Sequence, residues 1–467
     1  MPTCGQRNDD YLPNNLGLPI TSASNVMEIQ KALRLGKAPR VALVGSGGKT
    51  QTMFRLAREL SKPVLVTTTT HLSLSQANLA DQHHILRSDS DLPSVLNVID
   101  NNGIVLLTGP EGPDERYIGV DGNILDRLLK VCDVNGWGLL IEADGSRQKP
   151  LKAPADYEPV IPTFVDTVVV VAGLIGVGKP LTEEWVHRPS IFQGLSGIVS
   201  GEPITLEGVS IVLNHPEGGL KNIPNNARAI AQLNQADNVE RRSLSLKLAK
   251  KIVPPYHAAI TTSMTTEEGP ALAVHEKVAG VILAAGEARR FGKPKQVLEW
   301  RGLALVRRVA ETAIKADLDP VIVVTGAYEN EVTNALSGVR VQIVHNEAWK
   351  SGQSASLQAG VDQIPEHCGG VVFLLADQPW VTVELIRTVM DSHARGLAPI
   401  VAPLVDGDRA NPVLFDRRVF TDLLEIKGDV GGRALFSRYP IEYVTWHDRN
   451  VLLDIDTQAD FDQLMHS

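Results

Sequence analysis

A segment of glycines and basic side chains has the composition of a polyphosphate-binding loop. It reads VILAAGEARRFGKPK from Val281 to Lys295, an apolar stretch followed by a glycine and spaced cations. Gly286 would let the backbone approach a triphosphate, because glycine has no side chain. Arg290 and Lys295 would neutralise the phosphates and stabilise charge on a departing pyrophosphate. These residues predict binding of a nucleoside triphosphate and chemistry at its phosphates.

Aspartates that follow later apolar stretches could complete this site with a metal ion. Asp377 lies in the segment FLLADQP, and Asp456 lies in LDIDT. We predict that Asp377 and Asp456 are Mg²⁺ ligands, with Asp454 as a further candidate, since Mg²⁺ prefers carboxylate and phosphate oxygens. Each aspartate alone is typical of a cap or a loop. Their order behind the Gly286 loop favours the functional interpretation.

A second glycine loop lies in the segment VALVGSGGKT. An apolar strand, a glycine turn and Lys-Thr at a helix start are the parts of a P-loop. Gly47 and Gly48 would present backbone N–H groups to phosphate, Lys49 would supply a counter-charge, and Thr50 would coordinate Mg²⁺. The standard pattern requires a glycine where this chain has Leu43, so the loop is a shortened P-loop. The alternative is a strand–helix turn with a chance lysine.

Two carboxylates end the apolar stretch LLIEADG. Glu142 and Asp144 are two residues apart, so both can lie on one face of a strand tip. We predict that Asp144 and Thr50 hold Mg²⁺ beside the P-loop; a solvated strand end is the alternative. Threonines 67–70 either offer hydroxyls to the phosphates or form a strand edge. Asn234–Asp237 has the shape of a guanine-reading NKxD motif but lacks its lysine, so a cap or turn explains it better.

These side chains require elements that bring them to one edge of a sheet. Short apolar segments alternate with helical ones, which is typical of a parallel α/β sheet. After the first loop we expect a helix over Met53–Leu60. The expected strands of this half are Val64–Thr67, Ile104–Leu107, Gly138–Ile141, Thr167–Val171 and Ser210–Leu213.

The pattern lapses at TTSMTTEEGPALAVHE and then begins again with Val278. We predict an α/β fold with two domains. They are a P-loop-like parallel domain over 26–262 and a Rossmann-like domain over 278–467, with a loose tail over 1–25 and a linker over 263–277. In the second domain the expected strands are Pro320–Val324, Arg340–Val344, Gly370–Leu375 and Ile400–Pro403, and the expected helices are Leu303–Ala316, Glu329–Leu336 and Val383–Ala394.

Composition limits the class of protein. The chain has 467 residues, 43% of them hydrophobic, and a net charge of -9. No basic domain or tail is present, which argues against a nucleic-acid binder. Cys4, Cys132 and Cys368 form no metal or disulfide pattern, and no signal peptide or apolar span is visible. We expect a cytoplasmic enzyme with no nucleic-acid and no membrane partner.

The Gly286 loop resembles the LAAGxSxRxGxxK signature of nucleotidyltransferases that activate small molecules with a nucleoside triphosphate. Ala288 replaces the usual serine, which removes one hydroxyl contact to phosphate. FLLADQP and LDIDT resemble the metal-binding LADxP and late DxDT motifs of that family. The resemblance implies a nucleotidyltransferase domain over 278–467, with catalytic roles for Arg290, Lys295 and Asp377. It implies nucleotide contacts by Leu283, Ala284, Ala285, Gly286, Arg290 and Lys295.

The acceptor end resembles molybdenum cofactor cytidylyltransferases. In WKSGQSASLQAG, Ser354 and Ser356 could receive the pterin phosphate at a helix N-terminus, or could simply cap that helix. RANPVLF resembles a stretch that usually reads Gly-His-Pro, with Asn411 in place of histidine, and GDVGGR resembles GDxGAR, which implies an anion contact for Arg433. The guanylyl-transferring relatives usually read LAGG, so Ala285 favours CTP.

The first half resembles the YqeC-like family, proposed accessory proteins of selenium-dependent molybdenum hydroxylases. The resemblance covers roughly residues 26–262 and rests on VGSGGKT, the threonine run, EADGSRQKPLKAPADYEPVIP and LNHPEGGLK. It implies a molybdenum hydroxylase apoenzyme as a candidate partner. The P-loop chemistry makes ATP or GTP the candidate ligand of this half.

We therefore predict a molybdenum cofactor cytidylyltransferase that transfers CMP from CTP to the molybdopterin phosphate and releases pyrophosphate. Its N-terminal half would be a nucleotide-binding accessory domain. One alternative is guanylyl or other nucleotidyl transfer to a different phosphorylated acceptor. The other is a carrier or insertion chaperone for the molybdenum cofactor.

Overall fold

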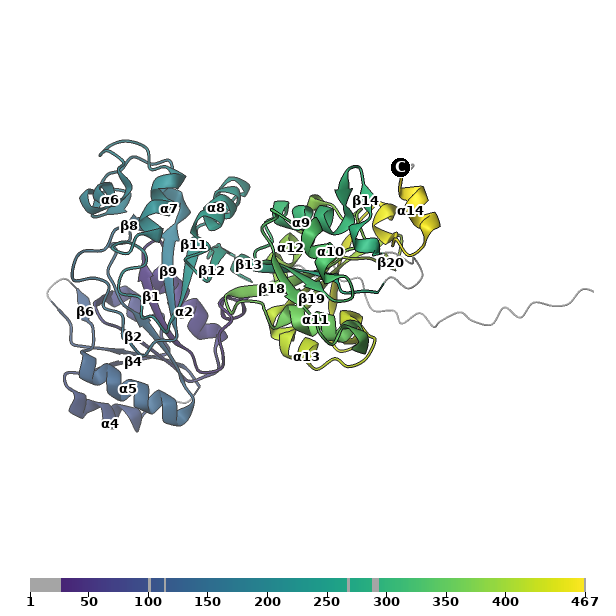
Figure 1. Cartoon of the computed structure of the whole chain (residues 1–467). Coiled ribbons are helices and arrows are strands. Elements are labelled where there is room, and N and C mark those ends of the chain that lie inside the picture. Colours follow the sequence, from purple (N-terminus) through teal and green to yellow (C-terminus); the bar gives the residue numbers. More distant parts are fainter. Residues whose placement is uncertain (1–26, 100–101, 113–114, 267–268, 288–293, 466–467) are drawn as a thin grey trace, which may run out of the picture.

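The computed structural model describes residues 27–99, 102–112, 115–266, 269–287 and 294–465. The predicted tail over 1–25 and the candidate Arg290 lie outside these ranges. Within them the chain forms two α/β parts, seen left and right in Figure 1. No described helix is long and apolar enough to cross a membrane.

The N-terminal part is built on a parallel sheet whose carboxyl ends carry the candidate phosphate residues. The expected strands before Ser210 are present, and three further strands, β4, β11 and β12, extend the sheet. In spatial order the strands are β4 (Gln82–Ile85), β5 (Ile104–Thr108), β2 (Val64–Thr68), β7 (Gly138–Glu142), β1 (Arg40–Gly45), β9 (Thr167–Gly173), β11 (Arg228–Asn234) and β12 (Ala258–Thr262).

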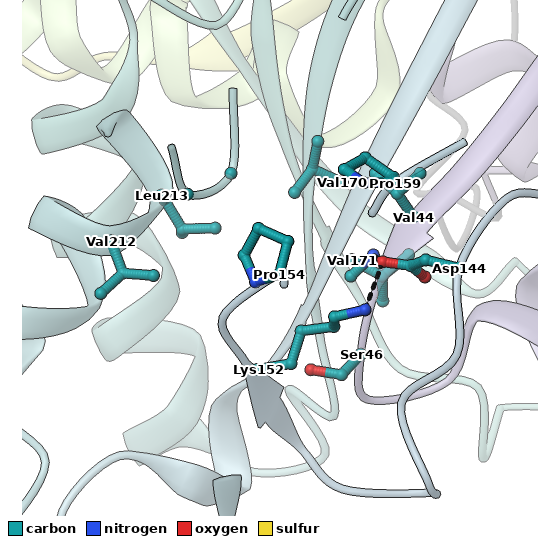
Figure 2. Close-up of a pocket in the computed structure, with 13 residues that line it drawn as sticks. Val44, Ser46, Asp144, Lys152, Pro154, Pro159, Val170, Val171, Val212 and Leu213 are labelled. Carbon is teal, nitrogen blue, oxygen red and sulfur yellow. Dashed lines mark hydrogen bonds and ion pairs between the residues drawn. The ribbon is translucent and has the colours of Figure 1, made fainter. Parts of the chain in front are cut away.

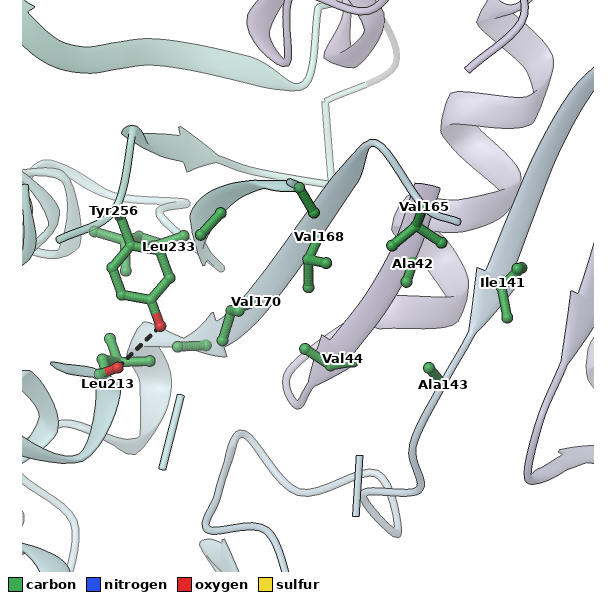
Figure 3. Packing of buried hydrophobic residues seen from close by; sticks show 14 of the residues in the cluster. Ala42, Val44, Ile141, Ala143, Val165, Val168, Val170, Leu213, Leu233 and Tyr256 are labelled. Atoms are coloured by element: carbon green, nitrogen blue, oxygen red, sulfur yellow. Dashed lines mark hydrogen bonds between the residues drawn. The ribbon is translucent and has the colours of Figure 1, made fainter. Parts of the chain in front are cut away.

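Side chains of alternate residues in these strands enter different cores, as the period of two requires. Ala42 and Val44 of β1 belong to the cluster in Figure 3, whereas Val41 and Leu43 face the opposite layer. The helices around this sheet are α1 (Ile29–Ala32), α2 (Lys49–Glu59), α3 (Leu74–Ala77), α4 (Leu92–Leu96), α5 (Gly122–Asn135), α6 (Pro189–Ser196), α7 (Leu206–Asn214) and α8 (Val239–Ile252). Short strand pairs are β3 (His71–Ser73) with β6 (Arg116–Ile118), and β8 (Leu151–Lys152) with β10 (Val186–His187).

The strand expected at Ser210–Leu213 is wrong, because this segment lies in helix α7. Thr205 caps the helix by accepting a hydrogen bond from Gly208 N. Val209 and Val212 are buried at a helical spacing. A short apolar run fits a strand and a buried helix equally well, so its composition alone misled the prediction.

Strand β13 (Ala271–Ala284) joins the two parts into one 16-stranded sheet. Its first half pairs antiparallel with β12, and its second half pairs parallel with β16 (Val321–Thr325) and β18 (Cys368–Leu375). The segment expected as a linker over 263–277 is therefore strand from Ala271 onward. Because β13 runs against β12, the carboxyl ends of the parallel strands lie at opposite edges of the sheet in the two parts.

The C-terminal part continues the sheet around β13. Ile282 faces the core under α9 and α12, and Val281 faces the core under α11. The other strands are β17 (Gln342–His345), β19 (Ile400–Val405), β20 (Asp408–Arg409), β21 (Val413–Asp416) and β22 (Ile441–Thr445), with the small pair β14 (Glu299–Trp300) and β15 (Leu303–Ala304). The helices are α9 (Leu305–Lys315), α10 (Glu329–Ala335), α11 (Gln353–Val361), α12 (Val383–Gly396), α13 (Phe420–Leu424) and α14 (Gln458–Met465).

A buried ion cluster also connects the two parts. Arg34, which follows α1, pairs with Glu276 of β13 at 2.7 Å and with Asp416 of β21 at 2.9 Å. The Asp416 side chain is fully buried and also contacts His393 of α12 at 2.8 Å. Burial alone would raise the pKa of Asp416, but hydrogen bonds from His393 and Arg34 hold this pKa well below its ordinary value.

Candidate functional sites

The Gly286 loop begins where β13 ends and is supported from behind by a buried amide. Gln296 Nε2 donates hydrogen bonds to the carbonyl oxygens of Ala284, at 3.3 Å, and Gly286, at 2.7 Å. Gln296 is only 3% exposed. Sequence reasoning missed this residue, because its partners are carbonyl groups that no side-chain pattern reveals.

Lys295 connects two of the predicted carboxylates. Its Nζ lies 2.5 Å from Asp377 Oδ2 and 2.8 Å from Asp456 Oδ1. Asp377 lies two residues after the end of β18, so the sheet edge positions it beside the Gly286 loop. Burial alone would lower the pKa of Lys295, but Asp377 and Asp456 raise it above its ordinary value. Lys295 therefore stays protonated at neutral pH.

The positions of Asp377 and Asp456 show whether a divalent ion would fit between these carboxylates. Asp377 and Asp456 both reach one ammonium group, so their oxygens can face one small cation. Two carboxylates plus substrate phosphates suit Mg²⁺, which keeps several waters. Among the described residues no cluster of three or more His, Cys, Asp or Glu side chains is placed to hold a metal. Asp454 instead accepts a hydrogen bond from Gln378, and partial burial raises its pKa.

A cavity of about 520 Å³ opens in front of the Gly286 loop. Helix α11 begins at this cavity, and Ser356 lines it while accepting a hydrogen bond from Asn346 at 3.0 Å. The hydroxyl of Ser354 instead donates to Gly428 O at 2.6 Å. Residues that line the cavity are Leu283, Ala285, Gly286, Glu287, Lys295, Gln296, Trp349, Lys350, Ser351, Gly352, Gln353, Ser356, Leu375, Ala376, Asp377 and Asp429.

A neighbouring cavity of about 480 Å³ shares Leu283, Gln353 and Leu375 with the first. Asn411 and Arg433 both line it. Its wall also carries the aromatic residues Phe373, Phe415 and Phe436, with Arg409 lying over the ring of Phe436. Adjacent cavities, one beside the lysine and Asp377 and one with arginines and aromatic rings, can hold two reactants next to each other.

In the N-terminal part, the first glycine loop has a backbone that side chains would obstruct. Gly45, Gly47 and Gly48 have φ angles of 88°, 87° and 121°. A Cβ atom at Gly48 would collide with Asn234 Nδ2, and that amide donates to Gly47 O at 2.7 Å. Thr262 in turn donates to Asn234 Oδ1 at 3.0 Å, so the ends of β11 and β12 support the loop. Asn234 thus supports the glycine loop from the end of β11, rather than forming the cap or turn that its sequence suggested.

Lys49 is the buried cation of this loop. Its Nζ donates to Gly45 O at 2.7 Å and lies 3.1 Å from Asp144 and 3.8 Å from Glu142. Burial alone would lower the pKa of Lys49, but these two carboxylates raise it above its ordinary value. The helix N-terminus of α2 and this ammonium therefore face the same small volume.

The two carboxylates at the carboxyl end of β7 both lie near Lys49 but accept hydrogen bonds from different donors. Thr50 Oγ1 donates to Glu142 Oε2 at 2.7 Å, and burial raises the pKa of Glu142. Asp144 accepts from Gly45 N at 2.9 Å and from Lys152 Nζ at 2.7 Å. The structure therefore brings Thr50 together with Glu142, whereas Asp144 is held under the loop.

Sequence reasoning missed further charged side chains that belong to this network of ion pairs. Lys152 also pairs with Glu158 at 2.8 Å, and Glu158 pairs with Arg188 at 2.7 Å. Burial alone would raise the pKa of Glu158, but hydrogen bonds from Arg188 and the charge of Lys152 lower it to about 2. Lys152 and Glu158 lie in the segment that follows β7, whereas Arg188 directly precedes α6, and no spacing in the sequence indicated that the three would pair.

Two cavities lie on either side of the loop. The inner one, in Figure 2, is about 30 Å³ and is lined by Ser46, Asp144 and Lys152 among apolar residues, which is room for about one water. The outer one is about 290 Å³. Its lining residues are Gly47, Gly48, Lys49, Thr50, Gln51, His71, Ser73, Gln76, Arg116, Glu142, Gly145, Ser146, Arg147, Gln148 and Gln235.

The threonine run contributes mainly to the sheet edge. Thr67 and Thr68 are buried and donate to the carbonyl oxygens of Leu107, at 2.7 Å, and Glu142, at 2.9 Å. None of the residues 67–70 lines the outer cavity. Of the two interpretations left open for them, the structure places them in the strand-edge role.

Comparisons with known proteins assign the two parts to families. Residues 41–190 match the family described as YqeC protein, and the chain is 32% identical to "Uncharacterized protein YqeC" of Escherichia coli (strain K12) over 213 residues. That alignment covers 43% of this chain and 77% of the relative. The chain belongs to the YqeC family.

The C-terminal part of this YqeC-family chain is a MobA-like nucleotidyltransferase domain. Residues 280–443 match the family described as MobA-like NTP transferase domain. "Nicotine blue oxidoreductase" of Paenarthrobacter nicotinovorans is 29% identical over 38% of this chain and 92% of the relative. "Probable molybdenum cofactor guanylyltransferase" of Bacillus cytotoxicus is 22% identical over 41% of this chain and 97% of the relative.

Proposed function

We propose that the C-terminal part transfers CMP from CTP to the terminal phosphate of molybdopterin, releasing pyrophosphate. The observation that carries this proposal is the group of Lys295, Asp377 and Asp456 beside two adjacent cavities. The nucleotide would occupy the cavity at Gly286. The pterin would occupy the neighbouring cavity, where aromatic rings suit a planar heterocycle and Arg433 suits an anion.

The transfer needs positioning and charge neutralisation more than proton transfer. An oxygen of the pterin phosphate would attack the α-phosphorus of CTP and form the new P–O bond. The bond from the α-phosphorus to the bridging oxygen would break, and pyrophosphate would leave with that electron pair. The attacking phosphate is already anionic, so no strong general base is required. Lys295 would stabilise the charge on the departing group, and we propose the same role for Arg290.

Asp377 and Asp456 are the residues that would hold Mg²⁺, which would neutralise phosphate charge when bound. Their convergence on Lys295 Nζ supports this assignment. The remaining site assignments follow the same layout. Leu283, Ala284 and Ala285 would contact the nucleotide, and Ser354, Ser356 and Asn411 would lie on the acceptor side.

CTP is proposed as the nucleotide because the loop opens with Leu-Ala-Ala-Gly, with Ala285 where guanylyl-transferring relatives usually have glycine. GTP is the second candidate, since the relative from Bacillus cytotoxicus is named a guanylyltransferase. The deciding assay gives the full chain molybdopterin, Mg²⁺ and one nucleoside triphosphate at a time. We expect pyrophosphate release with CTP; release with GTP alone would favour the second candidate.

Asp377→Ala distinguishes an enzyme from a carrier of the molybdenum cofactor. We expect the variant to lose transfer while remaining folded, because Asp377 is partly exposed at the end of β18. Asp408→Ala, an exposed site in β20, is the matched control and should retain activity. Normal transfer by Asp377→Ala would favour the carrier.

For the N-terminal part we propose ATP or GTP binding at Gly47, Gly48, Lys49 and Thr50. The buried Lys49 at the start of α2 supports this role. Either Glu142, which contacts Thr50, or Asp144 would complete a Mg²⁺ site there. The part would couple cofactor synthesis to maturation of a molybdenum hydroxylase in the cytoplasm.

We expect Lys49→Ala to weaken nucleotide binding here and to leave cytidylyl transfer largely intact; equal loss of both would indicate tight coupling.

A further inference from the structure

A second group of cations lines the outer cavity at the first glycine loop. The described charged residues of the lining, histidine aside, are Lys49, Arg116, Arg147 and Glu142, so positive charge is in excess. Lys49 is buried and lies 3.1 Å from Asp144, which balances its charge. The excess therefore comes from the two arginines, whose residues are exposed at the cavity. This excess of positive charge favours an anionic ligand. The ligand would extend beyond the glycine loop and Lys49 to reach the two arginines.

The loop that carries Arg147 is held at both ends, at one end by Lys152 of β8 and at the other by the glycine loop itself. Lys152 Nζ donates to Gly145 O at 2.7 Å. At the other end, Ser46 Oγ of the glycine loop donates to Pro150 O at 3.0 Å. Arg147 is thus presented from a segment whose position is fixed relative to the phosphate-binding backbone.

The backbone at Arg147 is also unusual. Arg147 and the next residue, Gln148, have φ angles of 47° and 58°, in the left-handed region that non-glycine residues seldom adopt. Both residues line the outer cavity. A strained pair at a cavity wall persists only when its surroundings determine it, as the anchors at Gly145 and Pro150 do here.

We propose that Arg147, assisted by Arg116, binds the terminal phosphate of a nucleoside triphosphate whose inner phosphates lie on residues 45–50. This inference rests on the proposed nucleotide binding of the N-terminal part. A guanidinium group offers paired N–H donors that match two phosphate oxygens. The site would then distinguish a triphosphate from a diphosphate, so nucleotide state would be read at the loop of residues 145–150.

The test measures the affinity of the full chain for a non-hydrolysable ATP analogue and for ADP by titration calorimetry. The corresponding GTP analogue and GDP are measured in the same way. Only the binding that Lys49→Ala removes is counted, which separates this site from the C-terminal one. We expect Arg147→Ala to weaken the triphosphate analogue about tenfold or more, the effect of losing a charged hydrogen bond. The affinity for the diphosphate should change less than about twofold, because its phosphates would not reach the guanidinium.

Two further variants sharpen the result. Arg147→Lys keeps the charge but loses the paired donors, and it should recover part of the affinity. Arg127→Ala removes an arginine of α5 that pairs with Asp89 and does not line the cavity, and it should change neither affinity.

The outcomes separate this inference from the proposal beneath it. If Lys49→Ala removes no binding of any nucleotide, the proposed nucleotide role of the N-terminal part fails. If Arg147→Ala weakens triphosphate and diphosphate equally, only the terminal-phosphate site is refuted. In a final experiment, inorganic phosphate is titrated into the ADP complex and its binding is measured. An Arg147-dependent phosphate signal with unchanged triphosphate affinity would place a separate anion there and would also overturn the inference.

Discussion

A lysine between two carboxylates lies at the centre of each candidate site; Lys49 is buried and Lys295 is partly buried. Lys49 lies between Asp144 and Glu142, and Lys295 lies between Asp377 and Asp456. In both lysines the carboxylates outweigh burial and raise the pKa above its ordinary value. Each ammonium therefore keeps two carboxylates close together. A bound phosphate could replace one of these carboxylates as the partner of the ammonium.

The different partners of Asp144 and Glu142 predict different losses. Asp144→Asn should lower the free energy of unfolding by about 3 kcal/mol, because Lys49 and Lys152 lose a buried counter-charge. Glu142→Gln should cost less stability and weaken Mg²⁺-dependent nucleotide binding about tenfold, because Glu142 contacts Thr50. Denaturant unfolding and nucleotide titration with and without Mg²⁺ measure the two effects. The reverse pattern would make Asp144 the metal ligand, as the sequence predicted.

Glu158 predicts a pH dependence of stability. Its pKa is lowered from 4.5 to about 2 in the folded chain. The stabilisation is therefore fully present above about pH 4.5 and is lost as the pH falls towards 2. We expect Glu158→Gln to be less stable than the native chain by roughly 2 kcal/mol at neutral pH, with the difference shrinking in acid. Unfolding curves at several pH values measure it; a constant difference would contradict the assignment.

At the scale of elements, the first glycine loop depends on the ends of β11 and β12. Gly48→Ala adds a Cβ atom that would collide with Asn234 Nδ2, at a φ angle of 121°. We expect this variant to lose roughly 2 kcal/mol of stability and most nucleotide binding at this site, since strain and collision add. Calorimetric titration and thermal unfolding measure both losses.

Gly178 provides the matched control for that substitution. Its φ angle is 81°, but the space around its Cβ position is open. Gly178→Ala should therefore cost about 1 kcal/mol from strain alone and leave nucleotide binding unchanged. Equal effects at the two positions would mean that contact with Asn234 is unimportant.

The sequence predicted elements where an apolar run leads directly into a glycine loop, as in β1 and the second half of β13. It did not predict the first half of β13, since Ala271–Lys277 mixes apolar and charged residues and becomes a strand only by pairing with β12. Helix α7 was misassigned because its apolar run is short. The signals that succeeded were local, whereas pairing partners depend on the whole fold.

The same distinction applies to the candidate sites. Local spacing indicated Lys49, Asp144, Lys295 and Asp377, which the structure places beside the two loops. The groups that hold these residues in place, such as Gln296 behind Gly286, come from unrelated positions in the sequence. Thr50 and Asp144 were expected to act together, but strand geometry places Glu142 next to the threonine.

For the whole molecule, the cluster around Arg34 predicts joint unfolding of the two parts. The Asp416 side chain is fully buried and Glu276 nearly so, hence Arg34→Ala leaves buried charges without their partner. We expect a loss of about 3 kcal/mol and a separation of the single unfolding transition into two. Differential scanning calorimetry of the full chain measures this.

Arg58→Ala is the control for that variant, because Arg58 forms an exposed pair with Asp81. Its loss should cost less than about 1 kcal/mol. A single transition in Arg34→Ala, unchanged from the native chain, would show that β13 alone keeps the parts together.

The direction of β13 has a consequence for how ligands enter and leave the two sites. Because β13 runs antiparallel to β12 and spans roughly 45 Å, the two glycine loops lie at opposite edges of the shared sheet. A ligand bound at one loop would therefore enter and leave at the edge of the sheet opposite to the other loop. A large protein bound over one of these edges would leave the other edge exposed to solvent, so the two sites could exchange ligands independently.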